Sequence, residues 1–251
     1  MVSSVNKHLP ITAKMRMADL IHLDYRLIPI IGRFGINMGF GNKNVTEICE
    51  ATGIDTDFFL EIINSYHNSD YFPKDQLQNF SSQLIIQYLS NTHQFYLTIK
   101  VKEIEAMIDT LSQQVYESNG MDMELFRSFF KEYKIELERH FEKEETEVFP
   151  YVHALEKACA TQYVSPELLR KLENEPIERY ERNHGDVEEK ITDLKNLIMK
   201  FLPPVKPQDL CQNLLMELFR MENDLQDHSR IEERVLVPKV KLLEKKVLQI
   251  G

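Results

Sequence analysis

The residue types that are scarce in this sequence already exclude several classes of protein. The 251 residues include no Trp, only three Cys and eight Gly, and there is no excess of basic residues. Because the Cys residues (49, 159 and 211) are odd in number and far apart, we expect reduced thiols rather than a disulfide framework. The net charge of −10 argues against nucleic acid as a partner. No apolar run approaches a membrane span, and the first residues lack the apolar core of a signal peptide. We therefore expect a cytoplasmic protein that binds neither nucleic acid nor membrane.

The residues that are abundant predict helices. Few Gly and Pro, many Leu, Ile, Glu and Lys, and few β-rich runs indicate an all-α fold. We expect residues 1–75 to form a small N-terminal helical domain and residues 76–251 to form an up-down four-helix bundle, since short connections favour antiparallel neighbours. The four long helices are expected at 79–117, 122–159, 176–202 and 207–247, with a short helix after Pro166.

Within the N-terminal domain, residues 12–35 look like one amphipathic helix broken by Gly, and residues 69–78 like a loop. Residues 44–67 look like two short helices around Gly53, and by length and turn they resemble a helix-turn-helix. This stretch contains no Lys or Arg, so DNA binding is not favoured.

Each long helix carries one His on its apolar stripe, and two of the helices add a Glu one turn after that His. A buried carboxylate is costly unless it is paired or bound to a metal. Side chains at positions i and i+4 lie on the same side of a helix, so a His and a Glu at this spacing can bind the same ion. The candidate metal ligands are His93, His140, Glu144, His184, His228 and Glu232.

An internal repeat supports a shared site. HFEKEETEVFPYV (140–152) aligns without gaps on HSRIEERVLVPKV (228–240), with His, Glu, Glu, Pro and Val in register. One HxxxE pair alone is usually a solvated ion pair, but two in register, with two further His on the stripes, are hard to explain by chance. Two helix pairs related by a pseudo-twofold would each supply two His and one Glu. We expect Pro150 and Pro238 to kink or restart their helices beyond the site.

The ligand types restrict the metal. Imidazole with carboxylate suits iron, manganese or zinc, and we favour iron. Two bridging Glu and two His for each ion would give four ligands, an oxo or hydroxo bridge would give a fifth, and one position would stay open. Such a site is suited to binding or reducing a small molecule.

The remaining candidates are expected to have lesser roles. Glu188 stands four residues after His184 but beside the apolar stripe, so we expect it to flank the site. Tyr133 and Tyr180 lie on the stripes and could supply nearby polar groups. Surface or packing roles are expected for the other His residues, which are His8, His22, His67 and His153.

The pieces around these residues resemble the hemerythrin-like superfamily, and more closely its di-iron proteins for repair of iron–sulfur centres. The matching pieces are SNTHQFYL, RHFEKEETEVFP, NHGDVEEK and QDHSRIEERVLVP, which span residues 79–247. The resemblance implies a non-haem site of two iron ions, with an oxo or hydroxo bridge. It implies terminal ligands at His93, His140, His184 and His228, and bridging carboxylates at Glu144 and Glu232.

The N-terminal segment RFGINMGFGNKNVTEIC is similar to a family segment that carries an adjacent Cys pair followed by Gly. In this chain Gly39 and Phe40 stand where that pair would be, and Cys49 fits a later Cys of the segment. The chain therefore lacks the Cys pair of the family that it otherwise resembles.

Three functional hypotheses follow. The first is a di-iron protein of nitrosative and oxidative stress that protects or repairs iron–sulfur centres, or reduces nitric oxide. The second is a sensor or carrier that binds dioxygen or nitric oxide without turnover, which the missing Cys pair favours. The third is a bundle without metal, in which the polar groups form a hydrogen-bonded core. The resemblance implies iron–sulfur client proteins as partners and is compatible with a homodimer; no catalytic residue is assigned.

Overall fold

The computed structural model describes residues 9–68, 70–115, 120–174, 176–181, 186–201 and 208–250. These residues form helices and the turns between them, with no β-strand among them, so the expected all-α fold is confirmed. None of the helices in these ranges is both long enough and apolar enough to cross a membrane. The chain divides into two compact units, Met1–Asn91 and Thr92–Gly251, at a point inside helix α6 (Ser82–Phe95). The expected domain boundary at residues 75/76 stays a prediction.

The first unit is built from short helices, which are α1 (Met17–Leu23), α2 (Leu27–Arg33), α3 (Val45–Thr52), α4 (Thr56–His67) and α5 (Lys74–Asn79). The expected single helix over 12–35 was wrong, because the chain turns between α1 and α2. Asp24 Oδ1 accepts hydrogen bonds from the backbone N–H of Arg26 at 3.1 Å and from its Nε at 2.8 Å. A side chain that bonds the backbone two residues later favours a turn over a continuing helix. The stretch 69–78 was expected to be a loop, but α5 begins inside it at Lys74.

Two short helices around Gly53 were expected, and α3 and α4 confirm them. Asn44 and Glu47 form a capping box that starts α3. Gly53 ends α3 with a φ of 70°, a left-handed conformation that Gly adopts without steric cost. Phe34 packs edge-on against Phe58 and Phe59, and this aromatic contact ties α4 to the residue that follows α2.

The described residues from Ser82 onward form four long helical segments, each of which includes a π-helical turn. They agree with the four expected helices, and α10 (Pro166–Asn174) is the expected short helix. Residues 182–185 of the third segment lie outside the described residues. The segments are α6 with η2 (Tyr96–Lys100) and α7 (Val101–Val115); α8 (Gly120–Lys143) with η3 (Glu144–Val148) and α9 (Phe149–Thr161); α11 (Ile177–Glu181) and α12 (Asp186–Asn196) with η4 (Leu197–Phe201); and α13 (Gln208–Ile231) with η5 (Glu232–Leu236) and α14 (Val237–Leu248).

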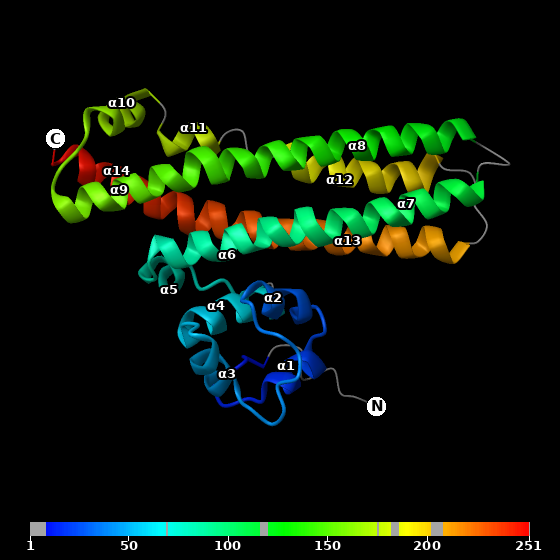
Figure 1. Cartoon of the computed structure of the whole chain (residues 1–251), viewed down its shortest axis with the longest axis horizontal. Coiled ribbons are helices and arrows are strands. Elements are labelled where there is room, and N and C mark those ends of the chain that lie inside the picture. Colours follow the sequence, from blue (N-terminus) through cyan, green and yellow to red (C-terminus); the bar gives the residue numbers. More distant parts are fainter. Residues whose placement is uncertain are drawn as a thin grey trace. The chain divides into compact units, whose positions relative to one another are not determined.

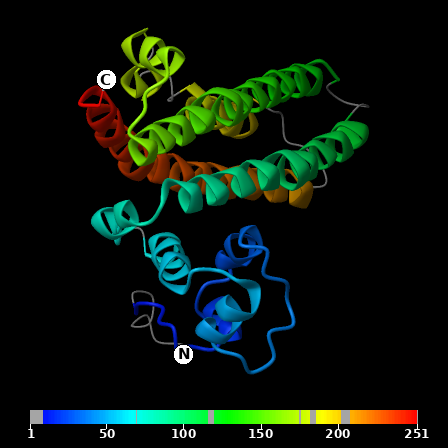
Figure 2. The same ribbon diagram turned by 60° about the vertical axis from the view of Figure 1, so that its left-hand side comes forward.

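The long helices close into a four-helix bundle. Helix α7 packs on α8, α8 on α12, α12 on α13 and α13 on α7, and these helices lie side by side in both views (Figure 1, Figure 2). Each contributes its apolar stripe to one core, as Ile104, Leu137, Leu194 and Leu218 illustrate, since all four are fully buried. Burial of such stripes is the main source of bundle stability, because isolated helices are marginal in water.

The π-helical turns were not expected from the sequence, and two of them begin at candidate ligands. Segment η3 begins at Glu144, and η5 begins at Glu232. Pro150 and Pro238 are the second residues of α9 and α14, so the α-helix restarts there as expected. A Pro inside a helix lacks its N–H and crowds the carbonyl four residues earlier, and a wider turn before it relieves this conflict. The internal repeat therefore encodes a repeated local geometry at each Glu.

Candidate metal centre

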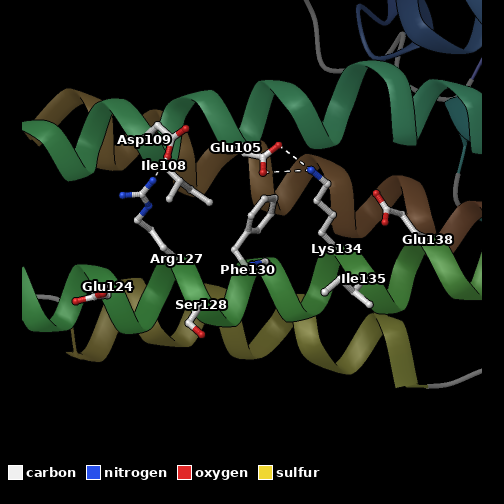
Figure 3. A pocket seen from close by; sticks show the side chains of 11 residues that line it. Glu105, Ile108, Asp109, Glu124, Arg127, Ser128, Phe130, Lys134, Ile135 and Glu138 are labelled. Atoms are coloured by element: carbon white, nitrogen blue, oxygen red, sulfur yellow. Dashed lines mark hydrogen bonds and ion pairs between the residues drawn. The ribbon is translucent and has the colours of Figure 1, made fainter.

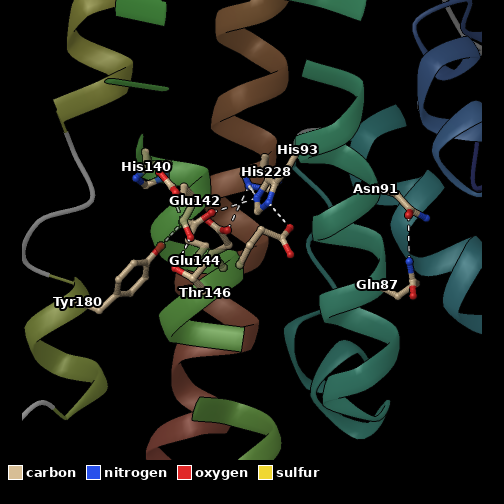
Figure 4. A network of polar contacts seen from close by, with 11 residues as sticks. Gln87, Asn91, His93, His140, Glu142, Glu144, Thr146, Tyr180 and His228 are labelled. Carbon is tan, nitrogen blue, oxygen red and sulfur yellow. Dashed lines mark hydrogen bonds and ion pairs between the residues drawn. The ribbon is translucent and has the colours of Figure 1, made fainter. Parts of the chain in front are cut away.

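Four buried side chains converge in the second unit. His93 comes from α6, Glu144 from η3, His228 from α13 and Glu232 from η5. Their potential ligand atoms all lie within 4.8 Å of one another. Nε2 of His93 lies 3.0 Å from Glu144 Oε2 and 3.2 Å from Nε2 of His228, which itself lies 3.1 Å from Glu232 Oε1. Figure 4 shows both His rings pointing toward Glu144.

His140 joins the same cluster from α8. Its Nε2 lies 3.1 Å from Glu144 Oε1, and its side chain is partly open to solvent. Thus the structure brings together five of the six predicted ligands, while the sixth, His184, lies outside the described residues. The side chain of Glu188 also lies outside them. That these residues bind metal stays a prediction.

The other His residues do not belong to this cluster. His22 and His153 are exposed, and His67 is buried in the first unit with its Nδ1 3.2 Å from Asp24 Oδ2. These positions agree with the surface and packing roles expected for them. His8 lies outside the described residues.

An aromatic wall covers one side of the cluster. The His93 ring stacks on Phe141 with 4.2 Å between ring centroids, and on Phe149 at 5.7 Å. Tyr96 meets the His228 ring edge-on at 6.0 Å. These rings exclude water from this side, so the charges inside interact through a low-dielectric medium.

Glu145 is a functional candidate that the sequence analysis missed. Its Oε1 lies 2.8 Å from Nδ1 of His93, the ring nitrogen that faces away from Glu144. Burial on its own would lower the pKa of His93, but hydrogen bonds to Glu144 and Glu145 and the nearby carboxylate charges raise this pKa to about 9. A carboxylate that holds the outer nitrogen of a ligating His fixes the ring and increases its basicity.

Tyr180 also contacts the cluster from outside the predicted ligand set. It was expected only to supply a polar group near the site, and its hydroxyl donates a hydrogen bond to Glu144 Oε1. Figure 4 shows the side chain reaching from α11 toward Glu144. Burial, followed by the negative charges of Glu232 and Glu144, raises the pKa of Tyr180, so the phenol keeps its proton. Tyr133 is fully buried in the bundle core.

The donor set fits a transition metal. Two imidazole nitrogens 3.2 Å apart face each other beside two buried carboxylates, and such a cluster is costly unless protons or cations lie between the groups. The donors are nitrogen and carboxylate oxygen without a thiol, which suits iron, manganese or zinc.

A separate surface hollow has no part in this cluster. It lies between α7 and α8, has a volume of about 490 Å³, and is lined by charged residues with a few apolar ones (Figure 3). Ion pairs cross it from Lys134 to Glu105 at 2.9 Å and from Arg127 to Asp109 at 2.7 Å. None of the four buried ligand candidates lines this hollow.

A comparison with known protein families also indicates a cation-binding domain in this part of the chain. The model of the hemerythrin HHE cation-binding domain matches residues 101–240, more than half of the chain. The match includes both HxxxE segments and begins after His93. A search of curated proteins and a search of solved structures each gave no match.

Proposed function

This chain belongs to the hemerythrin HHE cation-binding family, and on that premise we propose that its bundle holds two iron ions for chemistry with nitric oxide or dioxygen. The observation that carries this proposal is the convergence of His93, Glu144, His228 and Glu232 within 4.8 Å in a buried core. In this proposal Glu144 and Glu232 would hold the ions with their carboxylates. The His residues, with His140 and His184 included, would hold them with their imidazole nitrogens.

The chain's own residues would shape the reaction. A bound iron pair would supply open coordination positions and reversible electron transfer. Phe141, Phe149 and Tyr96 form the aromatic wall beside the imidazoles, which carries no cation and suits a small uncharged molecule better than an anion. The proposed role is in nitrosative and oxidative stress, through reduction of nitric oxide or through protection and repair of iron–sulfur client proteins in the cytoplasm.

A second candidate is a sensor or carrier that binds the diatomic molecule without turnover. The first unit supports it, because Gly39 has a φ of +100° and Phe40 is buried where the related segment carries its Cys pair. Cys49 is a free thiol, but it is fully buried, and burial raises its pKa. A thiol in this state is a poor nucleophile, so the first unit offers little support for thiol-dependent transfer of iron.

Nitric oxide turnover separates the two candidates. Iron-loaded protein would be mixed anaerobically with nitric oxide and a chemical reductant, and the headspace would be analysed for nitrous oxide. Nitrous oxide formed over many turnovers supports the stress enzyme. Spectral changes that reverse when nitric oxide is removed, with no nitrous oxide, support the sensor or carrier. Glu144→Gln protein serves as the control for reaction by loosely bound iron.

A further inference from the structure

Tyr180 gives the candidate metal centre an asymmetry that the internal repeat does not predict. It stands four residues before His184, whereas the residue four before His93 is Leu89. One half of the repeat therefore supplies a phenol, and the other half supplies an alkyl side chain. Tyr180 makes its hydrogen bond to Glu144, the carboxylate contributed by the first HxxxE segment.

The contacts of Glu144 show what this phenol can do. Oε1 accepts the hydrogen bond from Tyr180 and lies 3.1 Å from His140 Nε2, while Oε2 lies 3.0 Å from His93 Nε2. The carboxylate thus spans two imidazoles, one oxygen toward each. A Glu side chain has several rotatable bonds, and a donor fixed on another helix selects the one orientation that keeps this span.

The phenol is itself held in place. Tyr180 lies on α11, whose first residue, Ile177, is buried and donates its backbone N–H to Glu244 Oε1 at 2.9 Å. The ammonium group of Lys143 lies 5.9 Å from the centre of the Tyr180 ring, which adds a cation–π contact from α8. The donor is therefore fixed by contacts on both sides rather than by its bond to Glu144 alone.

We propose that Tyr180 is a positioning residue, which holds the Glu144 carboxylate in a metal-ready orientation before an ion arrives. This inference rests on the proposed function, because it assigns Glu144 to the metal site. A preorganised ligand loses less conformational entropy on binding, and loss of a partner outside the ligand set typically weakens metal affinity roughly 10–100-fold.

The test is the Fe(II) affinity of Tyr180→Phe protein, measured anaerobically against a competing chelator. Tyr71→Phe is the matched control, because the Tyr71 hydroxyl also donates to a Glu side chain, Glu61, at 2.6 Å, but within the first unit. We expect Tyr180→Phe to bind Fe(II) roughly 10–100-fold more weakly than wild type. Tyr71→Phe should match wild type.

Two results would overturn the inference. One is an equal Fe(II) affinity in Tyr180→Phe and wild type, or an equal loss in both variants, which would mean a general effect on the fold. The other is a visible phenolate-to-iron(III) band in oxidised wild type that disappears in Tyr180→Phe, which would make Tyr180 a ligand. If wild type binds no Fe(II), the proposed function fails instead, and the same titration with Zn(II) still tests the role of Tyr180.

Discussion

Nδ1 of His93 lies 2.8 Å from the carboxylate of Glu145, and this contact determines which nitrogen of the ring faces the buried cluster. The partner nitrogen, Nε2, is then directed at Glu144 and His228. Glu145 is part-exposed, with 40% of its side chain accessible, so it links a buried ligand candidate to the surface.

Glu145→Gln should weaken metal binding without removing it. The amide can hold the ring but supplies no negative charge, so His93 becomes a poorer donor, and we expect a loss of roughly 10–100-fold in affinity. The measurement is Fe(II) or Zn(II) affinity by competition. Glu147→Gln, a change at an exposed position in the same turn, is the control and should match wild type. Equal affinity in all three proteins would rule out this role for Glu145.

Replacing either proposed bridge should remove the metal. Glu144→Ala or Glu232→Ala leaves the remaining carboxylate and imidazoles in the core without their common partner, so we expect loss of metal and of stability together. Metal content and thermal unfolding of the purified variants check this. Glu222→Gln changes a buried carboxylate whose partners are Lys195 and Thr192, and it should keep its metal. Two irons retained in either bridge variant would show that the assignment is wrong.

The His residues provide an internal comparison. A His140→Ala, His228→Ala double variant should lose bound iron, because it removes a donor from each HxxxE segment. His153→Ala, at an exposed position, should keep the wild-type iron content. A double variant that stays folded and as stable as wild type, in a protein that never held iron, would instead support a bundle without metal.

The sequence predicted the bundle and most of the cluster because both depend on periodic patterns. The apolar stripes predicted one shared core, and Ile104, Leu137, Leu194 and Leu218 are buried in it. The repeated HxxxE spacing predicted that each His lies beside its own Glu. In the structure both pairs are 3.1 Å apart. These contacts follow from helical spacing alone, so no tertiary information was needed.

The contacts that the sequence did not predict depend on tertiary structure or on local backbone changes. Glu145 follows Glu144 directly, and spacing could not show that it would reach a His on another helix. Tyr180 stood on the correct stripe, but its partner could not be assigned. The π-helical turns at Glu144 and Glu232 were missed, although the repeated Pro was a signal for them. The split of residues 12–35 was missed because the turn depends on the side chain of Asp24.

Low pH should destabilise the first unit, because Asp24 becomes protonated. Burial on its own would raise the pKa of this carboxyl, but hydrogen bonds from Arg26 and His67 lower it below its ordinary value. A carboxyl with a depressed folded-state pKa stabilises the fold above its unfolded pKa of about 3.9, and this stabilisation is lost as pH falls through the folded value. Asp24→Asn should therefore destabilise the unit by about 1–3 kcal/mol at neutral pH and make it less acid-sensitive. Hydrogen exchange of α1 to α4 against pH measures both effects, and an unchanged acid profile would contradict this account.

The stability of the bundle should fall when one partner of a buried ion pair is removed. Lys195 Nζ donates to Glu222, whose other oxygen accepts from Thr192 Oγ1 at 2.5 Å, and both charged side chains are buried. Lys195→Met leaves the carboxylate without its cation and should cost about 3–5 kcal/mol in the free energy of unfolding. The double variant Lys195→Met, Glu222→Leu should recover much of this loss. Denaturant unfolding of wild type, the single variant and the double variant tests this prediction. A double variant that is less stable than the single variant would show that the pair is not electrostatically coupled.

The most direct test of the central claim is the metal content of the wild-type protein, purified anaerobically, with an optical spectrum recorded after exposure to air. The account predicts about two irons per chain, bound by the His and Glu set, and near-ultraviolet bands of an oxo-bridged pair. Protein that contains no metal, or a single zinc ion, would contradict the di-iron proposal.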